Sequence, residues 1–364
     1  MSERRYASDA LQPFTHGILR ALGAPPDVAD EVARHLVRAN LSGQDSHGVL
    51  RLPQYAGQAE RGELVPGNRP RVVKETTSTA LVDAQRGFGH YAAHIAVDIV
   101  SRKAREHGLA GAAIRHSTHV GRLGEFAERC QERGLVLLMT VGMAGPGVGG
   151  VVAHGGRERF FGSNVWAIGV PGTTHAMVFD GSMSSIAVGK VLVAKAAGHA
   201  LQPECLVDRA GRPSVDPDDY FAGGAVLPLG GAVAAHKGFG LGLAAALLGG
   251  LSMIGDDAPT LAGASAAPGA PTAGRMAGVF VIAIDPEAFG GVAPYRALVE
   301  DCLAALRAVA PAPGGAAVTT PGERSAQQRR ERELAGIPLA ASTTDELAVL
   351  AARLGVAMPE ALAA

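Results

Sequence analysis

The chain has 364 residues, and its 33 Lys and Arg residues nearly balance its 34 Asp and Glu residues. It has no basic stripe and no interleaving of aromatic with basic residues, which argues against a nucleic-acid partner. Hydrophobic residues make up 47% of the chain and charged residues 18%, so a sizeable core can form. The length favours two domains, or one large domain with an insertion.

Cysteine usage and the apolar segments indicate a protein of the reducing cytoplasm. Cys130, Cys205 and Cys302 are odd in number and far apart, so they predict neither a disulfide framework nor a zinc ribbon. The first residues lack the apolar stretch of a signal peptide. The most apolar run, 238–255, has nearly the length of a membrane span but contains six glycines. We therefore expect a buried helix there, and no membrane partner.

Helical patterns dominate both ends of the chain, and strand patterns its middle. In chain order we expect helices at 7–22, 26–40 and 49–61, a strand at 79–82, a helix at 92–107, a strand at 111–115, a helix at 124–133 and a strand at 135–141. A Gly/Val loop at 143–156 should precede two strands at 160–170 and 175–180, a helix at 185–198, a turn-rich stretch at 203–220 and the apolar helix at 237–254. A mobile loop at 256–274, a strand at 279–285, a helix at 295–308, a connector at 310–316 and helices at 325–335 and 344–354 complete the prediction. This order predicts a mixed α/β protein in which both termini form one layer beside a central sheet.

The segment 40–51 concentrates polar groups after a helical pattern. It contains Asp45, Ser46, His47 and Arg51, with glycines on both sides of the cluster. If a helix begins near residue 49, His47 and Arg51 can share a face. A guanidinium can hold a carboxylate while a neighbouring imidazole moves a proton, so the cluster suits an anionic substrate. The alternative is that Asp45 and Ser46 only cap the next helix.

A second pattern, Gly87-x-Gly89-x-x-Ala92, matches a dinucleotide-binding fingerprint. It follows a strand-like run and opens a helix, as that fingerprint should. Glu106 lies near the expected distance for a ribose-binding acid, but it would end the helix, and the strand at 111–115 offers no acid. We therefore favour a simple turn and helix start over a Rossmann site.

Further candidate groups lie on loops, where catalytic residues are usually presented. His119, like His47, lies in a short loop near glycine and could serve as a proton donor with a pKa near neutrality. His116 with His119, or His90 with His94, could be a metal pair, but no third ligand accompanies either, so no metal site is predicted. The stretch 179–185 precedes a helix and could offer backbone N–H groups to a phosphate.

The polar cluster resembles the signature of the type-2 malate/L-lactate dehydrogenase family, which also contains ureidoglycolate dehydrogenase, sulfolactate dehydrogenase and cyclic imino acid reductases. The resemblance continues, in the family's order, through His119-Val120-Gly121, Phe161-Gly162-Ser163-Asn164, Phe179-Asp180-Gly181-Ser182, Gly189-Lys190, Leu227-Pro228-Leu229-Gly230-Gly231, His236-Lys237-Gly238-Phe239-Gly240 and Pro321-Gly322-Glu323-Arg324. Each motif is weak alone, but the ordered set covers nearly the whole chain.

The resemblance implies a homodimeric oxidoreductase that transfers a hydride between NAD or NADP and a small 2-oxo, 2-hydroxy or cyclic imino carboxylate. Its fold would be a non-Rossmann NAD(P)-binding domain on a mostly antiparallel sheet, at 76–309, beside a helical substrate and dimerisation domain at 1–75 and 310–364. His119 would be the proton donor and acceptor, assisted by Ser46 and His47, and these two with Arg51 would contact the substrate. The implied cofactor residues are Asn164, Asp180, Ser182, Lys190, Lys237, Gly238, Gly322 and Glu323.

Three departures from the family pattern affect the predicted pocket. Val165-Trp166 replace the Pro that normally follows Asn164, Val141-Gly142-Met143 replace a short polar pair, and Thr118 precedes His119 where Asn or Gly is common. These changes predict a less polar pocket and a substrate with an apolar or bulky group, such as an imino acid. The alternative is a family member that has lost catalysis and acts as a ligand-binding or structural protein.

Overall fold

The computed structural model describes residues 3–254 and 276–362, so the loop predicted at 256–274 lies outside the described residues. The α-helices are α1 Ser8–Ala21, α2 Pro26–Leu41, α3 Leu52–Glu60, α4 Gly89–His107, α5 Gly124–Glu132, α6 Val188–Ala197, α7 Pro217–Phe221, α8 Gly231–Gly250, α9 Val292–Arg307, α10 Glu323–Ala335 and α11 Ala341–Leu354. Four 3-10 helices are η1 Asp45–His47, η2 Val49–Arg51, η3 Leu251–Met253 and η4 Pro286–Phe289. The strands are β1 Glu3–Tyr6, β2 Arg71–Glu75, β3 Thr79–Asp83, β4 Leu109–Arg115, β5 Val136–Ala144, β6 Val151–Val152, β7 Arg159–Phe161, β8 Val165–Val170, β9 Met177–Gly181, β10 Leu206–Val207, β11 Pro213–Ser214, β12 Ala225–Val226, β13 Met276–Ile284 and β14 Ile337–Ala340.

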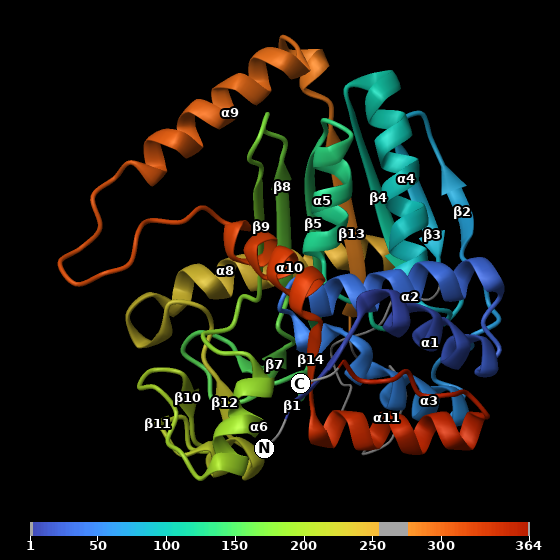
Figure 1. Cartoon of the computed structure of the whole chain (residues 1–364). Helices are drawn as coiled ribbons and strands as arrows, with labels where there is room; N and C mark the ends of the chain where they lie inside the picture. Colours follow the sequence, from blue (N-terminus) through green and yellow to red (C-terminus); the bar gives the residue numbers. More distant parts are fainter. Residues whose placement is uncertain (1–2, 255–275, 363–364) are drawn as a thin grey trace.

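Twelve strands form one mixed sheet centred on β5 and β13 (Figure 1). These two strands pair antiparallel along their whole length, from Ala144 opposite Met276 to Val136 opposite Ile284. In the described residues, two pairings of this sheet are parallel, β3 with β4 and β6 with β12, and the others are antiparallel. The mixed α/β class predicted from the sequence is confirmed.

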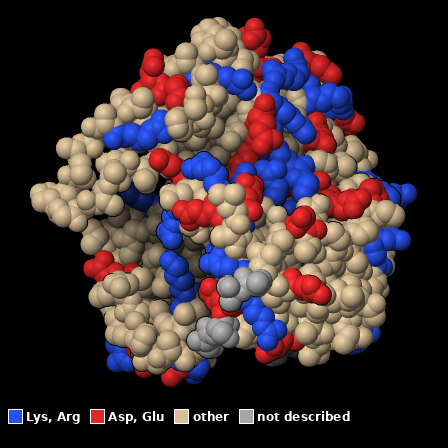
Figure 2. All heavy atoms as spheres, viewed as in Figure 1, with Lys and Arg blue, Asp and Glu red and all other residues tan. Residues whose placement is uncertain are grey.

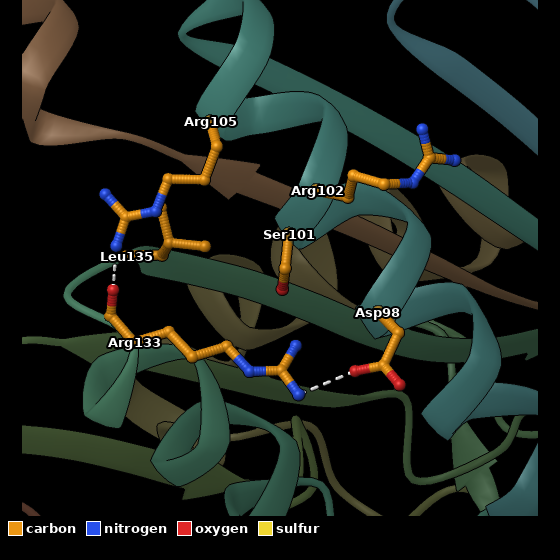
Figure 3. Close-up of a pocket in the computed structure, with 6 residues that line it drawn as sticks. All are labelled: Asp98, Ser101, Arg102, Arg105, Arg133 and Leu135. Carbon is orange, nitrogen blue, oxygen red and sulfur yellow. Dashed lines mark hydrogen bonds and ion pairs between the residues drawn. The ribbon is translucent and has the colours of Figure 1, made fainter.

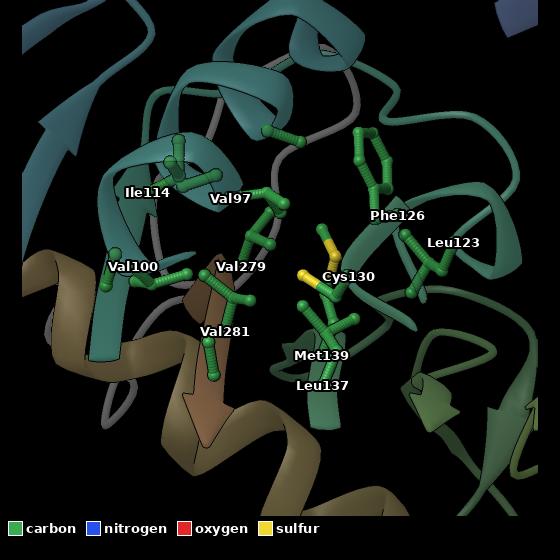
Figure 4. Close-up of a cluster of buried hydrophobic side chains, with 14 of the residues drawn as sticks. Val97, Val100, Ile114, Leu123, Phe126, Cys130, Leu137, Met139, Val279 and Val281 are labelled. Atoms are coloured by element: carbon green, nitrogen blue, oxygen red, sulfur yellow. The ribbon is translucent and has the colours of Figure 1, made fainter. Parts of the chain in front are cut away.

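Helices cover both faces of the sheet. On one face, α4 and α5 bury a cluster that includes Val97, Phe126, Leu137, Met139 and Val281 (Figure 4). On the other face, α8 packs against β5 and β13. The segment Gly231–Met253 is long and apolar enough to cross a membrane, and 33% of its most apolar 18-residue stretch is buried. Its packing on the sheet identifies α8 as a helix of the core, as the apolar run predicted.

Close packing of α8 depends on glycine. A Cβ built on Gly142 of β5 would lie 2.3 Å from the backbone of Ala245, and one on Gly278 of β13 would lie 2.3 Å from the carbonyl of Gly249. Backbones can approach this closely only where no side chain intervenes. The glycines of β5, β13 and α8 thus set the distance between the helix and the sheet.

The two ends of the chain share a second core. Buried side chains from α1, α2, α3, β14 and α11 pack together, among them Leu11, Leu36, Tyr55, Ile337 and Leu347. Strands β1 and β14 also pair antiparallel, with Glu3 opposite Ala340 and Tyr6 opposite Ile337. This terminal sheet was absent from the predicted elements, because each strand is only four residues long and its partner lies at the other end of the sequence.

Some predicted elements differ in extent. The helix expected at 49–61 is η2 followed by α3, whose first turn contains Pro53. The strand expected at 160–170 is divided into β7 and β8 because Asn164 adopts a left-handed backbone, with φ of 44°. Asn tolerates this conformation better than most residues, but it interrupts a strand.

Gly142→Ala is expected to destabilise the protein by about 2 kcal/mol, because the new methyl group would press α8 away from the sheet. The matched control is Gly240→Ala on α8, where a Cβ would meet nothing within 4 Å. This control should leave stability unchanged or raise it by about 0.5 kcal/mol. Urea unfolding of both variants measures the difference, and equal midpoints would contradict this account of the packing.

Candidate active site

The polar cluster predicted at 45–51 is a pair of 3-10 turns tied to the end of α2. The side chain of Asn40 donates to Asp45 Oδ1 at 2.7 Å and accepts from the backbone N–H of Val49 at 2.9 Å. A Cβ on Gly48 would lie 2.1 Å from Asn40 Oδ1, so the approach of the loop requires glycine there. Neither Asp45 nor Ser46 caps η1, η2 or α3 with its side chain, so the capping alternative is wrong.

A residue from the far end of the sequence completes this loop. Arg332 of α10 binds both carboxylate oxygens of Asp45, at 2.7 and 3.0 Å, and also donates to the carbonyl of Asn40. A two-pronged guanidinium contact fixes orientation as well as position. Helix α10 therefore holds the segment from which Ser46 and His47 project.

The structure brings the predicted catalytic and substrate residues together. The His47 and His119 rings stack with centroids 5.4 Å apart. Ser46 Oγ lies 2.9 Å from His47 Nδ1, and Arg51 Nε donates to the carbonyl of Ser46 at 2.6 Å. Arg51 also contacts Gln54, but it pairs with no carboxylate among the described residues. A guanidinium without a carboxylate partner in the described residues, beside two imidazoles, could hold the carboxylate of a ligand.

Tyr55 is a site residue that the sequence analysis missed. Its hydroxyl lies 2.8 Å from His119 Nδ1 and 3.3 Å from His90 Nε2. Tyr55 follows Arg51 by four residues, a spacing that places both side chains on one side of the chain. That spacing was the available signal, but a tyrosine in an amphipathic helix is usually a core residue, and Tyr55 is indeed buried.

The loop that carries His119 lies against the start of α4. Thr118 Oγ1 donates to the carbonyl of Gly87 at 2.8 Å and accepts from the N–H of Gly89 at 3.1 Å. A Cβ on Gly89 would lie 2.6 Å from the carbonyl of His119. Gly89 of the fingerprint-like pattern thus accommodates this loop, and its N–H, already donated to Thr118, is not free for a pyrophosphate. The hydroxyl of Thr118 is engaged in the same contact.

Both imidazoles are neutral at physiological pH. Burial, followed by the nearby charge of Arg51, lowers the pKa of His47 to about 4. Burial and the neighbouring His47 and Arg51 lower the pKa of His119 to about 3. With its Nδ1 held by Tyr55, His119 has Nε2 without a hydrogen-bond partner in the described part of the chain. That nitrogen can exchange a proton with a bound substrate.

Four of the predicted cofactor residues lie in turns and close backbone contacts of the fold. Asn164 accepts from the N–H of Met143 at 2.9 Å and donates to the carbonyl of Gly242 at 2.7 Å, joining β5 to α8. A Cβ on Gly238 would lie 2.3 Å from the carbonyl of Leu229. Gly322 and Glu323 form the turn into α10, where Gly322 has φ of 95° and Glu323 accepts from the N–H of Thr320 at 2.9 Å.

The other four cofactor candidates line more open positions. Asp180 accepts from the N–H of Gly124 at 2.7 Å, at the start of α5. Ser182 Oγ lies 2.9 Å from Ser184 Oγ, while Lys190 and Lys237 are exposed. Figure 2 shows a hollow between α10 and the lobe of α6 and β10–β12, with basic side chains at its edge.

The start of α6 fits a phosphate group. No side chain caps this helix, and a Cβ on Gly189 would meet nothing within 4 Å. Free N–H groups at a helix start, beside an exposed Lys190, attract an anion. A dinucleotide cofactor would therefore find phosphate partners here, in addition to the seryl side chains that precede the helix.

The departures from the family pattern lie in the sheet and its helix contact. Val141, Gly142 and Met143 continue β5 and pair with β13. Trp166 of β8 donates from Nε1 to the carbonyl of Leu241 in α8 at 3.1 Å. These residues therefore take part in the packing of β5, β8 and α8.

A cavity lies apart from the cluster around Arg51. A volume of about 540 Å³ on the α4 side is lined by Asp98, Ser101, Arg102, Arg105, Arg133 and Leu135 (Figure 3). Its arginines are already paired, since Arg133 binds Asp98 at 2.7 Å and Arg105 binds Asp285 at 2.9 Å. It therefore lacks the unpaired cation that marks the Arg51 site.

The mixed α/β fold and the cluster around Arg51 suit an enzyme that acts on carboxylates. A family model described as malate/L-lactate dehydrogenase matches residues 6–348. The chain therefore belongs to the malate/L-lactate dehydrogenase family of NAD(P)-dependent oxidoreductases, and the predicted resemblance is confirmed.

Individual relatives cover most of the chain. Hydroxycarboxylate dehydrogenase B of Escherichia coli K12 is 32% identical over 365 residues, covering 99% of this chain and 96% of that protein. A Δ1-pyrroline-2-carboxylate/Δ1-piperideine-2-carboxylate reductase of Pseudomonas putida is 36% identical over 246 residues, covering 66% of this chain and 70% of that protein. The crystal structure of malate dehydrogenase from Entamoeba histolytica has a TM-score of 0.90 at 25% identity and covers 99% of this chain and 100% of that chain.

Replacing Arg332 with Met should misplace the 45–51 loop and lower kcat/KM roughly tenfold, since small displacements of catalytic groups are costly. The control is Arg330→Met on the same helix, where the side chain is exposed. Steady-state kinetics and thermal melts of both variants provide the comparison. Full activity of a folded Arg332→Met variant would show that the Asp45 contact does not position the site.

Proposed function

We propose that the protein transfers a hydride between NAD(P)H and a small 2-oxo or cyclic imino carboxylate, and runs the reverse reaction on the 2-hydroxy acid. The observation that carries this proposal is the meeting of Arg51, which has no carboxylate partner in the described residues, with the neutral His119. The reaction of such a substrate requires a group that binds its carboxylate and a group that exchanges a proton. Arg51 suits the first role and His119 the second.

The residues divide the work by chemistry. Arg51 binds the substrate carboxylate, and Ser46 and His47, in contact with each other, bound the same space. The nicotinamide supplies or accepts the hydride when bound. In reduction the His119 ring, after taking up a second proton from solvent, gives its Nε2 proton to the carbonyl oxygen and returns to the neutral form. In oxidation a neutral ring with a bare Nε2 accepts the hydroxyl proton. Burial lowers the pKa of His119 most, and the nearby charge of Arg51 adds to it. A carboxylate bound at Arg51 offsets that added effect, so substrate binding favours protonation of the ring.

We propose that the cofactor lies along the eight predicted residues. The open start of α6, with Lys190, supports a phosphate contact there, and Asp180 links this region to the loop of His119 through Gly124. On this proposal 76–309 is the NAD(P)-binding domain, of a non-Rossmann type on a mostly antiparallel sheet. The segments 1–75 and 310–364 form the substrate domain. The experiment that identifies the substrate also decides between NAD and NADP.

The experiment is a panel of 2-oxo acids, 2-hydroxy acids and cyclic imino acids, assayed with both cofactors at 340 nm. His119→Gln should lower kcat by about 10²- to 10⁴-fold on 2-oxo acids. Arg51→Gln should raise KM for a substrate acid but leave the weak turnover of its amide unchanged. His107→Ala, at the exposed end of α4, is the control. Full activity of His119→Gln would end the proposal.

The panel also tests the alternative of lost catalysis. A protein that binds NADH or NADPH, seen as fluorescence quenching, but turns over no member of the panel would favour a ligand-binding role. Among active substrates, a preference for imino acids or for bulky 2-oxo acids over pyruvate would support the less polar pocket predicted from Val141-Gly142-Met143.

We propose that the protein is a homodimer. Besides the family resemblance, an apolar groove of about 400 Å³ beneath α9 supports this proposal. The groove is lined by Val136, Ile284, Pro286, Phe289, Gly290, Gly291, Pro294, Tyr295 and Leu298. Phe289 is 77% exposed and Leu298 65% exposed. Figure 1 shows α9 standing away from the sheet. A second copy would cover these side chains.

Light scattering should give a mass of twice the 37.0 kDa chain. Leu298→Glu should convert the dimer to monomers, because a buried unpaired charge opposes association. Leu334→Glu, on the exposed face of α10, should leave the dimer intact. If Leu334→Glu dissociates the dimer and Leu298→Glu does not, the helical layer is the interface; a monomeric wild type would refute the dimer.

A further inference from the structure

Behind His119, a continuous row of buried side chains leads into the protein. Tyr55 contacts His119 and His90 with the same hydroxyl, and the His90 ring lies edge-on to His35 with centroids 4.9 Å apart. His35 ends the row, with Nδ1 3.0 Å from Glu125 Oε2. His35, Tyr55, His90 and Glu125 are each at most 2% exposed.

Backbone geometry fixes the hydrogen positions at the inner end of the row. The N–H of Arg122 donates to His35 Nε2 at 2.9 Å. Because a backbone N–H can only donate, His35 Nε2 carries no proton, and the ring proton lies on Nδ1, facing the Glu125 carboxylate. Gly121 permits this packing, since a Cβ there would lie 2.3 Å from His35 Nε2.

The next ring, His90, has one satisfied nitrogen. Its Nε2 faces Tyr55, and its Nδ1 is buried with no hydrogen-bond partner. Burial lowers the pKa of His90 well below its ordinary value, so the ring is neutral and carries one proton. A buried N–H without an acceptor is rarer in proteins than an acceptor without a donor. The proton of His90 therefore belongs on Nε2, where it is donated to the Tyr55 oxygen.

This assignment determines the direction of the Tyr55 hydroxyl. Burial raises the pKa of Tyr55, so its single proton is retained. With His90 as the donor to its oxygen, Tyr55 donates its own proton to His119 Nδ1. The distances agree, because O–H donors make shorter bonds than N–H donors, and Tyr55 lies 2.8 Å from His119 but 3.3 Å from His90.

We propose that His90 is a positioning residue for His119: it sets the direction of the Tyr55 hydroxyl and thereby places the proton of the neutral His119 ring on Nε2. This inference rests on the proposed function for its catalytic meaning. Nε2 is the nitrogen left without a hydrogen-bond partner in the described residues. The resting enzyme then presents an N–H to the carbonyl oxygen of a 2-oxo substrate, which Arg51 holds by its carboxylate.

The test compares two amides in place of the ring. His90→Gln keeps an N–H donor near the position of Nε2, whereas His90→Asn places its amide near Nδ1 and does not reach Tyr55. His90→Asn should lower kcat for 2-oxo acid reduction about tenfold with little change in KM, and His90→Gln should restore most of the loss. Thermal melts monitor folding of both variants.

Coupling through Tyr55 separates positioning from general damage. In a Tyr55→Phe background the hydroxyl is absent, so His90→Asn should cause no additional loss of kcat. An equal tenfold loss in both backgrounds would overturn the proposal, because residues that act through one another are not additive. If His119→Gln leaves kcat unchanged, the proposed function fails; if it lowers kcat and His90→Asn does not, only the positioning role fails.

A readout independent of turnover is the ring ¹⁵N spectrum of protein labelled at histidine and without substrate. His119, assigned with His119→Gln, should show a bare Nδ1 and a protonated Nε2 in the wild type and in His90→Gln. His90→Asn should shift the signals toward a mixture of tautomers. A His119 ring protonated on Nδ1 in the wild type would refute the assignment outright.

Discussion

The arrangement of the candidate active site depends on a network of ion pairs that joins α2 and α10 to α5, a helix that packs on the large sheet. Glu125 of α5 is fully buried and binds Arg34 at 2.8 Å as well as His35, both from α2. Burial alone would raise the pKa of Glu125, but its contacts with His35 and the arginines hold that pKa at about 2. Figure 2 shows the charged side chains gathered over α2, α5 and α10. A second carboxylate, Glu128, binds Arg329 of α10 at 2.6 Å.

Such a network contributes more to alignment than to stability. Bringing charges out of water costs about as much as their attraction returns, so buried ion pairs are weak evidence for a stable fold. Their geometry is demanding, however, because each carboxylate must meet a particular guanidinium. His47 of η1 and Tyr55 of α3 belong to the N-terminal helices, whereas His90 of α4 and His119, which precedes α5, belong to elements packed on the large sheet. A shift between the two layers would separate Tyr55 from His119, and the ion pairs oppose that shift.

The sequence allowed the fold class and the meeting of Ser46, His47, Arg51 and His119 to be predicted. Periodicity and glycine positions locate long elements well, and the ordered motifs identify the family. The contacts that position the site were not predictable in the same way. Arg332 lies 287 residues from Asp45, and nothing in a run of charged residues on α10 distinguishes the one that reaches the loop. Tyr55 and His90 have the spacing of core residues, and their polar role appears only when the two layers meet.

The predicted cofactor residues fall into two groups, those with a packing role in the fold and those that are exposed. Family motifs mark residues that a shared fold requires as well as residues that touch ligands. Gly238, Gly322 and Asn164 have backbone or packing reasons for their identity in this structure, whereas Lys190 and Lys237 are exposed. A motif match alone does not show whether a residue is needed for the fold or for ligand binding. At Asn164 the structure does indicate a role in the fold, because its side-chain oxygen and nitrogen both make hydrogen bonds within the protein.

The electrostatics around Arg51 depend on which of the arginines have a carboxylate partner among the described residues. Arg34, Arg129 and Arg332 are each paired with a carboxylate, so their charges are largely cancelled at short range. Arg51 has no such partner in the described residues, and the histidines beside it are neutral. An anion placed beside Arg51 would therefore meet an uncompensated positive charge next to buried imidazoles, where a charge acts more strongly than in water. Burial lowers the pKa of His119 most, and the charge of Arg51 adds to that effect. On the proposed function, a carboxylate bound at Arg51 would therefore also favour protonation of His119.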